Sequence, residues 1–345
     1  MRYIGCKKLL LPQIKAIIEE YAPEAKSVCD IFSGTATVAR YLKSWYEVYS
    51  NDILYFSYCL QMATIQNSSK PEFKKLLSQT GISNPVQYFN SVDNKKMEEI
   101  AQDKRFFQNN YSPKGNRKYI TEENALRVDF ARISVEDWYK LGWLNQYEYY
   151  YLIAAIIEGI PFVSNIAGTY GAFSKQWDRR SYKKMELIDL PVTNNHKENR
   201  SYNEDANDLI KKIKGDVLYI DPPYNERQYL PNYHVLETAA KYDYPVLHGL
   251  TGQREYGDKQ KSLFCSKKTV LHAFEFIIKE ANFKHIILSY NTDGIMRLED
   301  IENIMKKYGQ KSSFKVHYID YKRYKSRKEV DNTSNLKEML IYVKK

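Results

Sequence analysis

The chain has 345 residues, 43% of them hydrophobic, which suffices for one large domain or for a core domain with a substantial insertion. Its 52 basic and 42 acidic residues give a net charge of +10, which favours a polyanionic partner such as nucleic acid, although a Lys-rich proteome produces the same excess. No apolar run has the length of a membrane-spanning helix or a signal peptide, and the cysteines and histidines lack the spacing of disulfide or zinc sites. We therefore expect a cytoplasmic protein with no membrane contact and no metal.

The first part of the chain predicts the start of a doubly wound α/β fold. Residues 9–21 carry apolar side chains at helical spacing, and an apolar run over 27–32 predicts a buried strand. A glycine-bearing turn, a helix over 36–44 and a second strand over 47–50 follow. This order of strand, turn, helix and strand is typical of nucleotide-binding α/β domains.

The middle of the chain has a different character. Residues 66–140 are polar, rich in turn signals and only weakly periodic. An apolar helix is predicted over 147–158, ended by Gly159-Ile160-Pro161, and residues 165–184 are again irregular and basic. We interpret residues 66–189 as an insertion that interrupts the α/β domain.

The α/β pattern resumes after about residue 190. Strands are predicted near 217–220 and 285–290, helices at about 204–214, 233–241, 267–281 and 298–308, and two final strands at 314–320 and 339–343. The final strands, joined by a long basic loop, predict a C-terminal antiparallel hairpin. Residues 1–65 and 190–345 would therefore form one α/β domain.

The tetrapeptide Asp221-Pro222-Pro223-Tyr224 directly follows the predicted buried strand at 217–220. An acid accepts hydrogen bonds from an amino group, the prolines fix the backbone, and the tyrosine ring offers a face for stacking. Ligands of open α/β sheets bind at the carboxyl ends of the strands. The motif therefore favours chemistry on the exocyclic amine of a nucleobase.

A second candidate site follows the first strand, where Asp30 and Phe32 lead into a turn at Gly34. Gly34 permits a tight turn and the close approach of a ligand, and Asp52 ends the next strand, where nucleotide-binding folds place an acid on ribose hydroxyls. The turn lacks the GxGxxG pattern of dinucleotide sites, so an adenosine joined to an amino acid fits better. An acid before a glycine turn is by itself more often structural, and the paired Asp52 favours the binding site.

These motifs, together with Tyr3-Ile4-Gly5-Cys6-Lys7 and Ser50-Asn51-Asp52, occur in the order found in Dam-like adenine-N6 DNA methyltransferases of the α permutation group. The chain resembles that family over residues 1–65 and 190–345. Within the insertion, the segment from Gly168 to Arg180 is similar to one found in a restriction-modification branch of the family. The resemblance implies the Rossmann-like sheet of S-adenosylmethionine-dependent methyltransferases, with the insertion as a target-recognition region.

The resemblance also implies S-adenosylmethionine as the cofactor and a contact for each matching position. Lys7 would contact the methionine carboxylate, Asp52 the ribose hydroxyls, and Asp205 the adenine amino group. The full set implied for the cofactor is Tyr3, Lys7, Asp30, Phe32, Gly34, Asp52 and Asp205. Asp205 serves equally well as the N-terminal acid of the following helix, stabilised by the helix dipole.

The catalytic positions implied by the resemblance are those of the tetrapeptide. Asp221 and the carbonyl of Pro222 would accept hydrogen bonds from N6 of an adenine extruded from the duplex, and Tyr224 would stack on its ring. Tyr290 and Asn291 would line the same pocket. The implied reaction is site-specific methylation of adenine N6 in double-stranded DNA, as in a restriction-modification system.

Basic side chains outside these motifs are candidates for DNA contacts. They are Arg227, the cluster that contains Lys175 and Arg180, and the run that contains Lys322, Arg323 and Lys325. Each can also be an ordinary solvated side chain, and Tyr170 and Phe173 beside the cluster can be core residues.

Other functions remain open at this stage. The same tetrapeptide suits methylation of cytosine N4 in DNA or of RNA, although the motif order favours adenine in DNA. A non-catalytic nucleic-acid-binding module would be expected to have lost one of the three strand-end acids, and Asp30, Asp52 and Asp221 are all present. A separately acting restriction endonuclease is a candidate partner, and a monomer is expected because no obvious dimerisation helix is found.

Overall fold

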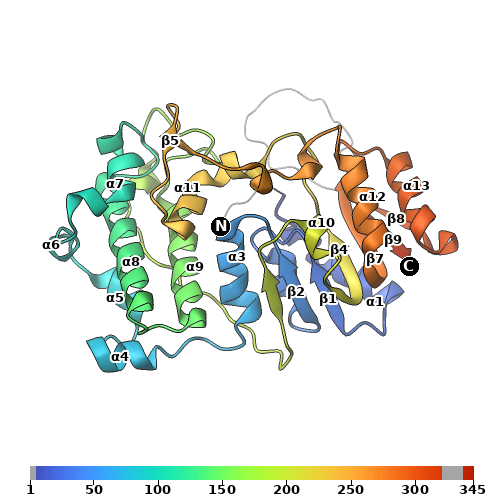
Figure 1. Cartoon of the computed structure of the whole chain (residues 1–345), viewed down its shortest axis with the longest axis horizontal. Helices are drawn as coiled ribbons and strands as arrows, with labels where there is room; N and C mark the ends of the chain where they lie inside the picture. Colours follow the sequence, from blue (N-terminus) through green and yellow to red (C-terminus); the bar gives the residue numbers. More distant parts are fainter. Residues whose placement is uncertain (1–4, 321–336) are drawn as a thin grey trace.

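The structure is a computed structural model that describes residues 5–320 and 337–345 (Figure 1). Its centre is a seven-stranded sheet with the strand order β3-β2-β1-β4-β7-β9-β8. The strands are β1 (Ser27–Asp30), β2 (Glu47–Asn51), β3 (Arg200–Tyr202), β4 (Lys214–Ile220), β7 (Asn282–Asn291), β8 (Lys315–Asp320) and β9 (Lys337–Lys344). Neighbours from β3 to β7 are parallel, whereas β9 is antiparallel to both β7 and β8. The predicted doubly wound sheet with a C-terminal antiparallel pair is confirmed, and β9 lies between β7 and β8.

Helices cover both faces of this sheet because its strands carry apolar side chains on both faces. One face packs against α1 and α2, and the other packs against α10, α12 and α13. The helices are α1 (Leu11–Tyr21), α2 (Thr37–Leu42), α10 (Ala206–Leu209), α12 (Val270–Glu280) and α13 (Leu298–Tyr308). The helix predicted at 204–214 is shorter in the structure, where α10 ends at Leu209 and β4 begins at Lys214, and β3 was not predicted.

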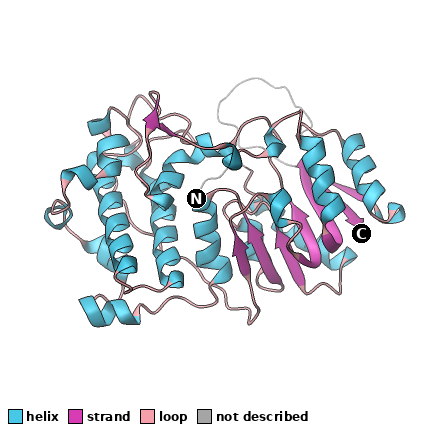
Figure 2. Cartoon of the chain, in the orientation of Figure 1, coloured by secondary structure: helices cyan, strands magenta, loops and turns pink. Residues whose placement is uncertain are grey.

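A helical body lies beside the β3 edge of the sheet (Figure 2). It contains α3 (Tyr55–Gln61) with a π-helical turn at Met62–Gln66, α4 (Lys74–Thr80), α5 (Pro85–Ser91), α6 (Asn94–Met97), α7 (Phe106–Asn110), α8 (Glu122–Lys140), α9 (Gln146–Val163), α11 (Tyr229–Lys241), and a hairpin of β5 (Leu247–His248) and β6 (Gln253–Arg254). Short 3-10 turns occupy Lys8–Leu10, Gln102–Lys104, Pro113–Gly115, Arg179–Tyr182, Asp258–Gln260, Leu263–Cys265 and Lys311–Ser313.

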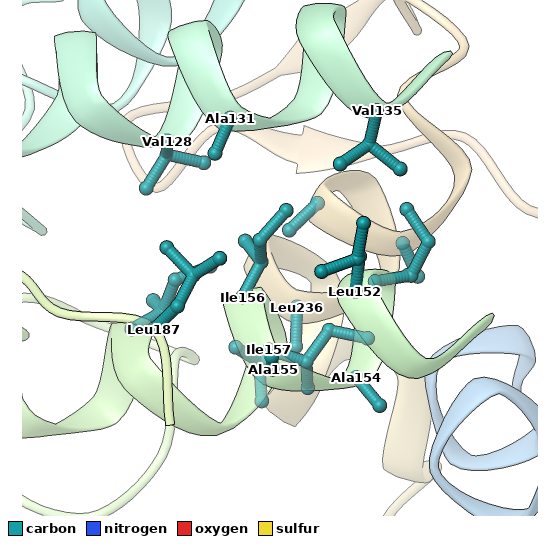
Figure 3. Close-up of a cluster of buried hydrophobic side chains, with 14 of the residues drawn as sticks. Val128, Ala131, Val135, Leu152, Ala154, Ala155, Ile156, Ile157, Leu187 and Leu236 are labelled. Atoms are coloured by element: carbon teal, nitrogen blue, oxygen red, sulfur yellow. The ribbon is translucent and has the colours of Figure 1, made fainter. Parts of the chain in front are cut away.

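The core of the helical body joins segments that are distant in the sequence. Val128 and Val135 of α8, Leu152 and Ile156 of α9, and Leu236 of α11 belong to one buried cluster (Figure 3). The segment proposed as the insertion thus shares its core with α11, which follows the tetrapeptide Asp221-Pro222-Pro223-Tyr224. Within the described residues, no helix is both long and apolar enough to span a membrane.

The sequence analysis did not predict α8, and the physical reason is that this helix buries polar residues. The Asp129 carboxylate accepts hydrogen bonds from the backbone N–H of Phe107 (2.7 Å) and of Gln108 (2.9 Å). The guanidinium of Arg132 is fully buried and donates to the carbonyl of Ala239 at 2.7 Å. Such a helix is buried on most of its surface and shows no alternation of apolar and polar faces, so its sequence lacks the helical period.

The prediction that Gly159-Ile160-Pro161 ends the apolar helix is wrong, because α9 continues to Val163. At its start, Asn145 and Glu148 form a capping box. At its end, Ile160 and Val163 are buried, and this burial offsets the hydrogen bond that Pro161 cannot make. Gly159 is required for packing, because a Cβ there would lie 2.1 Å from the carbonyl oxygen of Glu186.

Replacing Gly159 by alanine is expected to destabilise the protein by about 2 kcal/mol, because the overpacking outweighs the better helix propensity of alanine. Urea unfolding measures the loss. Gly168→Ala is the matched control, since nothing lies within 4 Å of a Cβ at Gly168. Equal stability of the two variants would contradict the packing argument.

Candidate active site

A pocket lies at the carboxyl ends of β1, β2 and β4, and its atom-free volume is about 970 Å³ with the open mouth included. The chain leads from β1 to β2 on one side and from β4 to β7 on the other, so the pocket lies at a topological switch point of the sheet. The residues predicted from the sequence that line it are Lys7, Asp30, Phe32, Gly34, Asp52, Asp205, Asp221 and Tyr224. Pro222 is buried beside the lining residue Pro223, and Tyr3 lies outside the described residues.

The turn after β1 is held by the acid that follows β2. Gly34 has a φ of +51°, and its N–H donates to Oδ2 of Asp52 at 2.9 Å. The N–H of Leu54 donates to Oδ1 of the same carboxylate at 2.9 Å. Burial raises the pKa of Asp52 to about 6, although these two hydrogen bonds lower it. Asp52 therefore fixes the turn and also presents a carboxylate to the pocket.

Asp30 ends β1 with a carboxyl group that is almost fully buried, at 2% exposure. Its Oδ1 has no hydrogen-bond partner among the described residues. Burial, together with the nearby Asp221, raises the pKa of Asp30 to about 8. A buried carboxyl oxygen without a partner is unfavourable, so this position is suited to a ligand that brings a hydrogen-bond donor or a positive charge.

Asp205 and Phe32 border another part of the pocket. The carboxylate of Asp205 accepts a hydrogen bond from the N–H of Asn207 at 2.8 Å and so caps α10. Burial raises the pKa of Asp205. Phe32 packs edge-on against Phe264, with ring centroids 5.0 Å apart. Asp205 thus has the capping role that we considered from the sequence, while it also lines the pocket.

Asp221 lies next to a buried lysine that a second acid also contacts. Lys7 Nζ is 3.3 Å from Oδ1 of Asp221 and 3.0 Å from Oε1 of Glu338. Burial alone would lower the pKa of Lys7, but the two carboxylates raise it well above its ordinary value. Burial raises the pKa of Asp221 to about 7, although Lys7 lowers it. Lys7 remains a cation in this arrangement and pairs with the protein's own carboxylates.

Tyr224 completes this side of the pocket. Lys7 Nζ lies 5.5 Å from the centroid of its ring, and the ring of Tyr290 meets it at 89° with centroids 6.4 Å apart. Tyr290 was expected to line the pocket, but it is fully buried behind Tyr224. A Cβ on Gly294 would lie 2.1 Å from the Tyr290 ring, so glycine at that position allows the ring to pack there.

Comparison with known proteins identifies the family. The sequence model of the D12 class N6 adenine-specific DNA methyltransferases matches residues 3–304. The chain belongs to this family. The resemblance to Dam-like enzymes is thereby confirmed, and so is the methyltransferase fold.

Individual methyltransferases are also similar to the chain. It is 46% identical over its whole length to the Type II methyltransferase M.FokI of Planomicrobium okeanokoites and 43% identical to the modification methylase StsI of Streptococcus sanguinis. The chain spans about half the length of these two proteins, 53% and 52%. It is 33% identical to the Type II methyltransferase M.NlaIII of Neisseria lactamica, with 97% of the chain and 94% of that protein covered.

The candidate DNA-contacting residues of this D12 chain lie in different environments. Arg227 and Lys175 are exposed. Arg180 donates to the carbonyl of Ile166, and its Nε lies 3.3 Å from Oδ2 of Asp178, so part of its guanidinium holds the local loop. Lys322, Arg323 and Lys325 lie outside the described residues.

The two aromatic residues beside the basic cluster pack in or against the core of the helical body. Tyr170 is buried, with its hydroxyl 3.0 Å from that of Ser164. Phe173 packs edge-on against Tyr119, with centroids 5.1 Å apart. Tyr170 is thus a core residue, and Phe173 is partly buried and packs against the same core.

The sequence analysis missed Glu338. This acid is 4% exposed and precedes the apolar run Met339–Val343, where the predicted strand began two residues after the true start of β9 at Lys337. An acid at the edge of an apolar strand was the signal that could have identified it, because an unpaired buried acid is unfavourable and its burial indicates a partner. The partner, Lys7, is 331 positions away in the sequence.

Proposed function

We propose that the chain transfers a methyl group from S-adenosylmethionine to N6 of an adenine that is flipped out of double-stranded DNA. The observation that carries the proposal is a pair of acids that lie at the carboxyl ends of the neighbouring strands β1 and β4 and line one pocket, the buried Asp30 and the partly exposed Asp221. Asp30 precedes the turn that Asp52 holds, and Asp221 begins the motif that includes Tyr224. This arrangement provides two adjoining binding regions, one for the methyl donor and one for the base.

The residues on the β1 side fit S-adenosylmethionine. Asp30 Oδ1 has no partner among the described residues and suits the cationic amino group of the methionine portion. Asp52, held on the Gly34 turn, suits the ribose hydroxyls, and Asp205 with Phe32 suits the adenine ring. When bound, the cofactor supplies an electrophilic methyl group on a sulfonium centre and leaves as a neutral thioether.

On the β4 side, Asp221 and Tyr224 would hold the base. Lys7 pairs with Oδ1 of Asp221, which leaves Oδ2 to accept a hydrogen bond from the N6 amino group. The carbonyl of Pro222 would accept the second N6 hydrogen, and Tyr224 would stack on the ring. These contacts orient the nitrogen lone pair and exclude water, and such orientation supplies a large part of the rate enhancement. The base has to leave the duplex because N6 is out of reach within the stack.

The DNA duplex would bind through phosphate contacts from basic side chains, in keeping with the net charge of +10. We assign such contacts to Arg227, Lys175 and Arg180, and to the run with Lys322, Arg323 and Lys325. The relatives named as modification methylases support a restriction-modification role, in which a separate endonuclease would cut the unmodified site.

The test is nucleoside mass spectrometry of DNA from a methylation-free bacterial host that expresses the chain. N6-methyladenine is the expected product, and sequencing its positions gives the recognition site. Methylcytosine without methyladenine would overturn the assignment of the base. Unmodified DNA from well-expressed protein would overturn the assignment of the substrate, and the RNA of the same cells would be examined next.

Replacing Arg227 by alanine is expected to weaken DNA binding to all sequences alike. Loss of one phosphate contact should also reduce the slope of log affinity against log salt concentration by about 0.9. Fluorescence anisotropy at several salt concentrations measures both effects. Lys74→Ala is the control, because this exposed lysine of α4 does not line the pocket. An unchanged salt slope would remove Arg227 from the interface.

A further inference from the structure

Glu338 occupies an unusual place for an acid. It lies on the antiparallel strand β9, opposite Asn291 of β7, and is 4% exposed. Its Oε1 accepts a hydrogen bond from Lys7 Nζ at 3.0 Å, whereas Oε2 has no hydrogen-bond partner within the described part of the chain. A buried carboxylate destabilises the fold when one of its two oxygens lacks a hydrogen bond. Its presence beside the site is therefore better explained by its charge than by its contribution to stability.

The charge of Glu338 reaches Asp221 through the shared lysine. Lys7 Nζ is 3.0 Å from Glu338 and 3.3 Å from Asp221, so one cation serves two carboxylates. If Lys7 paired with Asp221 alone, it would stabilise the ionised form of Asp221 and make that carboxylate a poor proton acceptor. The second carboxylate opposes this effect, because it holds the ammonium group and repels added negative charge on Asp221.

Other ionisable groups also surround this cluster. Asp30 of β1 and Tyr219 of β4 lie on the same face of the sheet, with Asp30 opposite Tyr219 in the strand register. Tyr224 lies beside Lys7, and Tyr229 also lines the pocket. The pKa of Asp221 is raised to about 7, and burial is the largest cause. Among the charged neighbours, Lys7 lowers the pKa of Asp221 and Glu338 raises it. Glu338 is thus the acid that acts against Lys7.

We propose that Glu338 is a positioning residue that acts through Lys7 to keep Asp221 able to accept the proton that N6 loses. The inference rests on the proposed function. Methylation forms one N–C bond at N6 and breaks the C–S bond of the donor, after which one N–H bond of N6 breaks. The proton passes to Oδ2 of Asp221 and from there to water. A proton acceptor works best when its pKa lies near the working pH, and Glu338 keeps Asp221 in that range.

The test is Glu338→Gln, which keeps the shape of the side chain and removes its charge. The titration of Asp221 is followed by carbon NMR of unliganded protein labelled in its aspartate carboxyl groups, with Asp221→Asn used to assign the signal. We expect the titration midpoint to fall by about one pH unit, because the repelling charge is lost and Lys7 pairs with Asp221 alone. The acid limb of kcat against pH should move in the same direction, and the plateau of kcat should fall severalfold.

Two further variants separate charge from packing. Glu338→Asp retains the charge and should keep the midpoint close to that of the wild type. Ser289→Ala changes a neutral buried side chain on β7, the strand between β4 and β9, and should leave the midpoint unchanged. An unchanged midpoint in folded Glu338→Gln would overturn the proposal. A wild-type chain that methylates no DNA would overturn the proposed function, whereas the NMR titration still decides whether Glu338 governs the charge of Asp221.

Discussion

Replacing Asp221 by alanine is expected to reduce the turnover number by roughly a hundredfold to a thousandfold while the affinity for DNA survives. The carboxylate lies at the end of β4 and lines the pocket, and in the proposed mechanism it would accept a hydrogen bond from the reacting amine, so its loss would remove stabilisation of the transition state. The contacts that we propose with the DNA backbone involve other residues and should be unaffected. Single-turnover kinetics with a duplex that contains the recognition site measure the loss.

The control for this experiment is Asp103→Ala, which removes an exposed acid from the helical body. It should leave turnover unchanged. Thermal unfolding has to show that Asp221→Ala is folded, because the substitution also leaves Lys7 with Glu338 as its one acidic partner in the cluster. Turnover within a few-fold of the wild type in the folded variant would remove Asp221 from the catalytic role.

The acids of the pocket could be predicted because their signals are local. Asp30 lies within the apolar segment 27–32, Asp221 directly follows the apolar run 217–220, and Asp52 follows the next strand after the glycine turn. Parallel strands in a doubly wound sheet bring such positions to one edge. The alternation of strands and helices was therefore enough to predict that these acids lie in one site, without knowledge of distant contacts.

The remaining features depend on contacts between distant parts of the chain. The buried carboxylate of Asp129 is satisfied by α7 and by the hydroxyl of Tyr242, 113 positions away, at 2.7 Å. Such polar burial removes the helical period from α8 and conceals the helix. Glu338 could not be predicted from the sequence for the same reason. Its contact with Lys7 forms only in the folded chain, where β9 lies between β7 and β8 and the N-terminal segment brings Lys7 next to it.

Replacing Asp30 by asparagine is expected to weaken the binding of S-adenosylmethionine by about a hundredfold, because the substitution removes the negative charge opposite the cationic amino group. The pKa of Asp30 in the free protein is raised to about 8 by burial. Binding of a cation favours the ionised form, so cofactor affinity of the wild type should rise as the pH increases toward 8. Isothermal calorimetry in buffers of several pH values measures the affinity, and this dependence should be weaker in Asp30→Asn.

The same substitution is expected to stabilise the unliganded protein. A buried acid whose pKa is raised binds a proton more tightly in the folded state than in the unfolded state, so its contribution to stability is lost as the pH rises from about 4 to about 8. Asparagine cannot ionise, and the gap between the melting temperatures of Asp30→Asn and the wild type should therefore widen over this range. A variant that binds the cofactor poorly and is also less stable at every pH would show that Asp30 supports the fold. Weaker binding with higher stability is the result expected of an acid that is retained for its ligand, because its buried charge destabilises the free protein.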